Sequence, residues 1–127
     1  MTAAGRLGGA RWVERYEPGV AAELPSSDAS FADLVASSAA SAPTFPALEC
    51  LGRTVSYAAL AALGERVAAG LARDGVRAGD RVLVALPECP ESVAATLGVL
   101  RAGAVARHAP YRDPDAVRAA AEGCAAA

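Results

Sequence analysis

The chain has 127 residues, a formal net charge of −2 and a hydrophobic content of 54%. This length corresponds to one domain, and the apolar content excludes a disordered or low-complexity protein. The mildly acidic net charge argues against a basic surface of the kind that binds nucleic acid or an anionic membrane. All 12 basic residues are arginines, because the sequence contains no lysine.

The first part of the sequence, residues 1–29, is predicted to be an irregular leader because glycine, proline and serine are frequent there. It lacks the apolar core of a signal peptide. The whole sequence also lacks an apolar run of about 18 residues, so we expect no transmembrane helix. Trp12 and Tyr16 are expected to attach the leader to the body of the protein by burying their rings.

The first helix is predicted over residues 31–41. Ser30 and Asp33 have the spacing of a capping box at its start, and a proline two residues beyond Ser41 predicts its end. Helical periodicity gives one face that we expect to pack on the core. That face contains Phe31, Leu34, Val35 and Ser38.

Two short strands, residues 44–50 and 53–55, are predicted to form a β-hairpin with a tight turn at Leu51 and Gly52. Pro46 indicates an edge position for the first of them. A long helix over residues 57–74 then follows, capped by Ser56 and ended by Gly75. Its apolar stripe contains Tyr57, Leu60, Leu63, Val67 and Leu71.

The remaining sequence predicts a strand, a helix and a second strand, over residues 81–86, 91–102 and 104–108. The first strand is apolar without alternation, as in a parallel sheet covered on both faces, so we expect a βαβ unit. Asp113 and Pro114 then begin a last helix that Gly123 ends. Two parallel strands and one hairpin make an incomplete sheet, which indicates the first part of a larger α/β domain.

Residues suited to catalysis are scarce. The loop over residues 86–90 has no glycine and carries an acid, so it is unsuited to cradling a phosphate. We expect Cys89, at a helix start between two glutamates, to be a structural or incidental thiol, and His108 to be satisfied or to face solvent. Cys50, Cys89 and Cys124 are odd in number. This favours reduced thiols in a cytoplasmic protein over disulfides or a zinc site. We assign no catalytic, cofactor-binding or metal-binding residue.

Four stretches in order resemble a known family. Residues 52–60 (GRTVSYAAL), 75–82 (GVRAGDRV), 86–91 (LPECPE) and 97–105 (LGVLRAGAV) are similar to core motifs of the AMP-forming adenylating enzymes. The leader, with Trp12, Tyr16 and the Pro18–Val20 stretch, is most similar to long-chain fatty-acyl-CoA ligases. Two departures are Ala59, where the family has a glutamate that would complete a capping box, and the stretch after Val105.

The resemblance implies an α/β fold: an incomplete first portion of the large N-terminal domain of an adenylate-forming enzyme. Residues 30–127 are then a partial AMP-binding domain that stops before the phosphate loop, and the catalytic lysine lies elsewhere. The full-length family uses ATP, Mg²⁺ and CoA to convert a carboxylic or fatty acid to acyl-AMP and then to acyl-CoA. We expect this chain to bind none of them, and whether it is itself an enzyme stays open.

Two interpretations follow. The first is an N-terminal fragment of an AMP-forming acyl-CoA ligase, inactive alone, whose partner is the remainder of the ligase. The alternative is a non-catalytic interaction module that keeps the family scaffold and pairs with a complementary chain through an open sheet edge. No charge or proline protects the apolar strand in the sequence, which favours the first interpretation.

Overall fold

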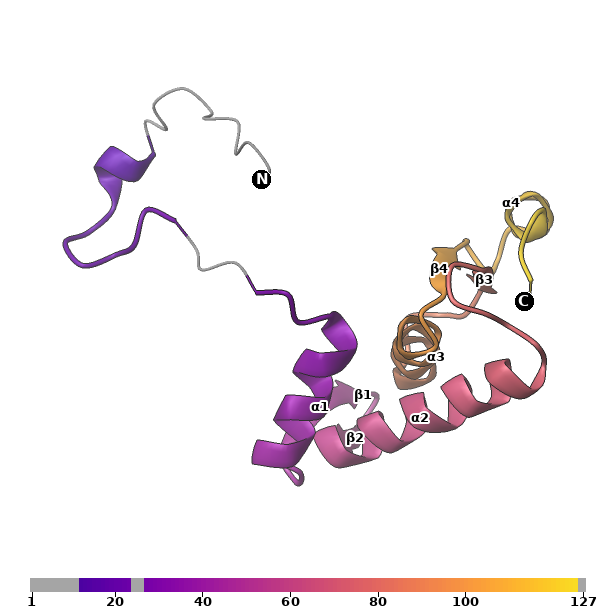
Figure 1. Ribbon diagram of the computed structural model, residues 1–127, viewed down its shortest axis with the longest axis horizontal. Coiled ribbons are helices and arrows are strands. Elements are labelled where there is room, and N and C mark those ends of the chain that lie inside the picture. Colours follow the sequence, from indigo (N-terminus) through magenta and orange to yellow (C-terminus); the bar gives the residue numbers. More distant parts are fainter. Residues whose placement is uncertain (1–11, 24–26, 126–127) are drawn as a thin grey trace.

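The computed structural model describes residues 12–23 and 27–125 (Figure 1). The fold is mixed α/β, as the sequence predicts. Its elements in chain order are η1 (Val13–Arg15), α1 (Phe31–Ser41), β1 (Pro46–Cys50), β2 (Arg53–Ser56), α2 (Tyr57–Arg73), β3 (Arg81–Val84), α3 (Pro90–Arg101), β4 (Val105–His108) and α4 (Pro114–Ala121). None of the helices in these ranges is long and apolar enough to cross a membrane.

Helix starts follow local side-chain chemistry. The Ser30 hydroxyl accepts a hydrogen bond from the Asp33 N–H at 3.2 Å, and the Asp33 carboxylate accepts from the Ser30 N–H at 2.9 Å, which confirms the capping box. At α2 the Ser56 hydroxyl accepts from the Ala59 N–H at 3.3 Å, and Ala59 has no carboxylate to return the bond. Each cap satisfies an N–H that has no partner inside its helix.

The two sheets are both two-stranded and differ in direction. β1 and β2 form the predicted antiparallel hairpin, whose turn residues Leu51 and Gly52 have φ angles of +49° and +76°. A left-handed conformation at both positions matches the twist of a tight hairpin. β3 and β4 are parallel, with Arg81 opposite Val105 and α3 as the connection, so the predicted βαβ unit is confirmed.

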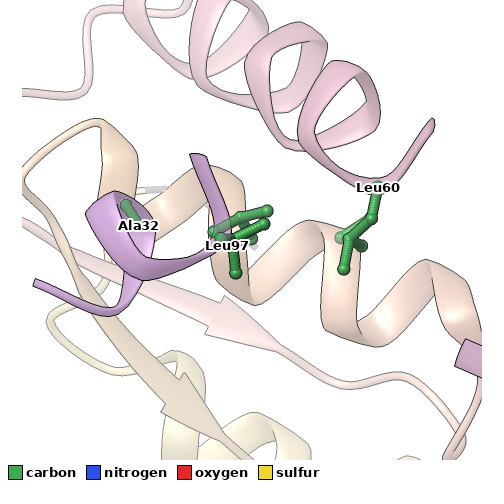
Figure 2. Packing of buried hydrophobic residues seen from close by; sticks show 5 residues of the cluster. Ala32, Leu60 and Leu97 are labelled. Atoms are coloured by element: carbon green, nitrogen blue, oxygen red, sulfur yellow. The ribbon is translucent and has the colours of Figure 1, made fainter. Parts of the chain in front are cut away.

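The core has two parts, and α2 and α3 contribute to both. The first cluster joins α1, α2 and α3 (Figure 2), and its buried residues are Ala32, Val35, Leu60, Ala94 and Leu97. The second cluster lies around the parallel strands, and its buried residues are Val76, Val82, Val84, Val99 and Ala104. The predicted stripe of α2 faces these clusters, with Leu60 buried and Leu63, Val67 and Leu71 half-buried.

Two glycines let α2 and α3 approach each other closely. A Cβ added at Gly98 would collide with the Val67 side chain and lie 2.9 Å from the Gly64 carbonyl oxygen. A Cβ added at Gly64 would lie 2.8 Å from the Leu97 side chain. The helix pair that connects the two clusters therefore depends on small residues at its crossing.

Several apolar residues do not pack as the sequence predicts. Trp12 and Tyr16 are 57% and 42% exposed, and η1 buries no residue, so the expected attachment of the leader is wrong. On α1 the predicted face is partly wrong: Val35 is buried as expected, but Phe31 and Leu34 are more than half exposed and Ala32 is buried in their place. Helical spacing also predicts a core face of Val93, Leu97 and Leu100 on α3, but Leu100 is exposed and Val99 takes a core position.

Candidate functional site

The carboxyl ends of β3 and β4 define the candidate site, because ligands of parallel α/β sheets bind outside the carboxyl ends of the strands. The loops that follow the two strands together line a hollow of about 480 Å³, which we call the carboxyl-end hollow. Its lining residues are Leu86, Glu88, His108, Ala109, Pro110, Tyr111 and Arg112.

Tyr111 and Arg112 form the most organised polar group of this hollow. The Arg112 Nε donates a hydrogen bond to the Tyr111 hydroxyl at 2.7 Å, and the guanidinium carbon lies 5.3 Å from the centre of the Tyr111 ring. This geometry combines a hydrogen bond with a cation–π contact. Within the described residues Arg112 is exposed and has no ion-pair partner.

His108 is exposed at the end of β4, as expected. Its Nε2 lies 3.4 Å from the Thr96 hydroxyl, and that hydroxyl donates its proton to the Ser92 carbonyl at 2.8 Å. The Thr96 oxygen can then accept a hydrogen bond from the ring.

The start of α3 does not provide an anion site beside the hollow. The Cys89 N–H lies 3.4 Å from the Ser92 hydroxyl, which in turn donates to the Cys89 carbonyl at 2.8 Å. Glu91 occupies the first turn, and its pKa is lowered by its own backbone N–H, by the Cys89 thiol and by Arg53, whose guanidinium is 3.3 Å away. An ionised carboxylate already fills the positive end of this helix.

The described residues are poorly suited to binding a metal ion or a phosphate group. No group of three or more His, Cys, Asp or Glu side chains there is placed to hold a metal ion. Cys50, Cys89 and Cys124 are half-buried free thiols. The loop after β3 contains Pro87, which has no N–H, and the exposed Glu88, so its residues do not fit the phosphates of a nucleotide.

The family model of AMP-binding enzymes matches residues 35–116, which include the hairpin, α2 and the whole β3–α3–β4 unit. The chain belongs to the AMP-binding enzyme family. The long-chain-fatty-acid–CoA ligase of Bacillus subtilis is 32% identical over 94 residues, which are 74% of this chain and 17% of that protein. The pyochelin synthetase PchE of Pseudomonas aeruginosa is 48% identical over 66 residues, 52% of this chain and 5% of that protein.

Solved structures give the same result for the fold. A structure named as a long-chain-fatty-acid CoA ligase of Rhodopseudomonas palustris has a TM-score of 0.66 and 32% identity, over 72% of this chain and 24% of that chain. The N-terminal subdomain of Klebsiella oxytoca NpsA, bound to 3-hydroxyanthranilyl-AMSN, has a TM-score of 0.64 and 25% identity, over 67% and 22%. The described fold thus corresponds to part of the N-terminal domain of an adenylate-forming enzyme.

The sequence prediction assigned no site residue, whereas the structure gathers Glu88, His108, Tyr111 and Arg112 around one hollow. The sequence could have indicated this group through the position of its residues, because they end or follow the two strands that were predicted to be parallel. Their grouping does not include a nucleophile beside a base or a cluster of metal ligands, which are the usual marks of a catalytic centre.

Proposed function

We propose that this chain is a scaffold portion of an AMP-forming acyl-CoA ligase. In that reaction a carboxylate attacks the α-phosphorus of ATP and releases pyrophosphate, and the thiol of CoA then displaces AMP from the acyl-adenylate. The observation that carries the proposal is the family match across the β3–α3–β4 unit. The ligase of Bacillus subtilis, similar over 74% of this chain, supports a fatty acid as the substrate class.

In this proposal residues 30–127 precede the phosphate loop of the domain, and residues 1–29 are a leader. The partner is the remaining polypeptide of such a ligase, in the cytoplasm, where thiols stay reduced. ATP, Mg²⁺ and CoA act in the complete enzyme. The described residues do not fit a phosphate group, so we assign them no step in the reaction. Their role is to build the sheet and the helix layer on which an active site rests.

The test measures exchange of pyrophosphate into ATP in the presence of long-chain fatty acids, aromatic acids and amino acids. The purified chain alone is expected to show none, with the intact Bacillus subtilis ligase as the positive control. In a chimera, the 94 matching residues of this chain replace the corresponding segment of that ligase. Exchange with fatty acids by the chimera supports the scaffold role. Exchange by the isolated chain, or a folded chimera without activity, contradicts the proposal.

A further inference from the structure

Two of the three cysteines lie on one small hollow. Cys50 ends β1 and Cys89 directly precedes α3, and both line a hollow of about 190 Å³ that we call the thiol hollow. Both are half-buried free thiols. The hollow is also lined by Leu48, Glu49, Glu88, Pro90 and Val93. The hairpin and the start of α3 thus bring two nucleophilic side chains to the same place from distant parts of the sequence.

The packing of β1 on α3 explains why these two residues share a hollow. Alternate residues of a strand lie on one face, so Cys50 follows Leu48 on the same face of β1. Cys89 lies one turn before Val93, whose N–H donates to the Cys89 carbonyl at 3.4 Å. Leu48 and Val93 are half-buried and pack against the first core cluster. One step along β1 and one turn back along α3 lead from this apolar contact to the two cysteines.

Polar contacts also join the hairpin to the start of α3 beside this hollow. Arg53 is opposite Cys50 in the hairpin register, and its guanidinium lies 3.3 Å from the Glu91 carboxylate. The same carboxylate accepts a hydrogen bond from the Cys89 thiol. One carboxylate therefore contacts both the strand partner of Cys50 and the thiol of Cys89.

The third cysteine provides a contrast within the same chain. The Cys124 thiol donates to the Ala120 carbonyl at 3.2 Å, beside α4, and Cys124 is not among the residues that line the thiol hollow. About 40 residues separate Cys50 from Cys89, and about 35 separate Cys89 from Cys124, so the entropy of loop closure hardly distinguishes these pairings. A preference of Cys89 for Cys50 must therefore come from the fold.

We propose that Cys50 and Cys89 form a reversible dithiol–disulfide site whose oxidant is a low-molecular-mass disulfide. One cysteine thiolate attacks a sulfur of that disulfide, which forms a mixed disulfide and releases one thiol. The other cysteine thiolate attacks the protein sulfur of the mixed disulfide and releases the second thiol. The protein loses two protons and two electrons, and the oxidant takes them up as two thiols. This site goes beyond the proposed function, because no step involves a carboxylic acid, ATP or CoA.

Carboxylates around the thiol hollow select the charge of the oxidant. Glu49 and Glu88 line the hollow, and Glu91, which pairs with Arg53, lies beside Cys89. We therefore expect cystamine, a cationic disulfide, to react several-fold faster than oxidised glutathione, which carries carboxylates. Salt should reduce this ratio of rates, and so should Glu49→Gln combined with Glu88→Gln. A ratio that neither change affects contradicts this selection by charge.

The main experiment treats the reduced full chain with cystamine, in native buffer and in guanidinium chloride. Trypsin then places the three cysteines on separate peptides, because arginines lie between them, and mass spectrometry identifies the pairs. In native buffer the Cys50–Cys89 disulfide should exceed the Cys89–Cys124 disulfide by about tenfold or more, whereas in denaturant the two should be about equal. Equal yields in native buffer, a predominant Cys124 pairing or a disulfide between two chains overturns the proposal.

Three matched variants, each with two cysteines, test the pair directly. Cys124→Ser should lose two hydrogens on oxidation, whereas Cys50→Ser and Cys89→Ser should stop at mixed disulfides with cystamine. Circular dichroism shows that each variant is folded. Oxidised Cys124→Ser should melt about 5 °C or more above its reduced form, because the cross-link constrains the unfolded chain. A folded Cys124→Ser that forms no internal disulfide, or one that melts lower when oxidised, overturns the proposal.

Discussion

The hairpin and the parallel pair show two ways of building a small sheet. β1 and β2 are joined by a turn of two residues, and the first core cluster covers them with α1, α2 and α3. β3 and β4 are separated by the whole of α3. Beside β3 lie an apolar hollow of about 450 Å³, which we call the β3 hollow and which is lined by residues of α2, β3 and α3, and an edge whose Arg81 carbonyl accepts a hydrogen bond from the Ala125 N–H. The hairpin completes its pairing with adjacent residues, whereas the parallel pair depends on residues far along the chain.

The difference follows from strand direction. An antiparallel hairpin needs only a short turn, but each parallel neighbour requires a crossover of a dozen or more residues. A strand that is apolar on both faces, as β3 is, also needs cover on both sides and neighbours at its edges. The incomplete part of this fold is therefore the parallel part, and substitutions should affect the two regions unequally.

The largest expected effect comes from truncating one residue in each core cluster. Leu97 and Val99 are 2% and 1% exposed, two positions apart on α3, and belong to different clusters. Leu97→Ala should lower the free energy of unfolding by about 3–4 kcal/mol, since it leaves a closed cavity. Val99→Ala should cost about 2 kcal/mol, because one carbon fewer is lost and the site lies beside an existing hollow.

Urea denaturation followed by circular dichroism measures both variants. A greater loss for Val99→Ala than for Leu97→Ala would show that the parallel region, despite the β3 hollow, is the more tightly packed of the two.

The next effect concerns the helix crossing that joins the two regions. Gly98→Ala places a methyl group 2.9 Å from the Gly64 carbonyl and against Val67, so the helices must separate. We expect a loss of about 2–3 kcal/mol, typical of overpacking. Gly70→Ala is the matched control, because its nearest neighbour is the end of Arg73 at 4.0 Å, and it should stabilise α2 by about 0.5–1 kcal/mol.

Thermal and urea denaturation of these two glycine variants test the crossing. If Gly98→Ala is as stable as Gly70→Ala, the close approach of α2 and α3 is not required for the fold.

A smaller gain is expected where β2 passes into α2. Ser56 caps α2 without a reciprocal partner, and Ala59 is exposed. Ala59→Glu supplies a carboxylate to the Ser56 N–H and completes the capping box, which should stabilise the protein by about 0.5 kcal/mol. Ala62→Glu introduces the same charge on an exposed residue one turn later, where it cannot cap. An equal gain from both variants would attribute the effect to charge rather than to capping.

The smallest effect is a pH dependence at the start of α1, the helix that packs in the same core cluster as the hairpin. Hydrogen bonds from the Ser30 hydroxyl and the Ser30 N–H lower the pKa of Asp33 below 3.8. A lowered pKa in the folded state means that this contribution to stability is complete above about pH 4 and is lost as pH falls through the folded pKa. NMR titration should show Ser30→Ala raising the pKa of Asp33. Ser27→Ala, whose hydroxyl contacts Ala29 instead, should leave it unchanged.

Local chemistry made much of this fold predictable. The caps at Ser30 and Ser56 and the left-handed Gly75 were readable because each acts on backbone groups within a few residues. The consecutive apolar residues of β3 predicted a parallel partner in the same local way. A strand buried on both faces needs apolar side chains at successive positions, and that pattern is visible in the sequence.

Tertiary packing was less predictable. Periodicity placed Phe31, Leu34 and Val35 on the core face of α1, and Val35 is buried there, but small residues decide how closely helices approach, so Ala32 is buried where Phe31 and Leu34 were expected. The same reason explains Val99 and the crossing at Gly98. The carboxyl-end hollow depends on the loops of two strands meeting in space, and no spacing in the sequence specifies the contact of Arg112 with Tyr111.

The bond between Ala125 and Arg81 has a consequence for synthesis on the ribosome. β3 ends at Val84, and the residue that first reaches its outer edge is translated about 40 residues later. At about 5–20 residues per second, this interval lasts roughly 2–8 s. α1, the hairpin and α2 precede β3 in synthesis and can fold first, whereas the outer edge of β3 lacks this bond until Ala125 has been made. Slow codons between β3 and α4 would lengthen that interval, so translation rate in this region should influence the yield of folded protein.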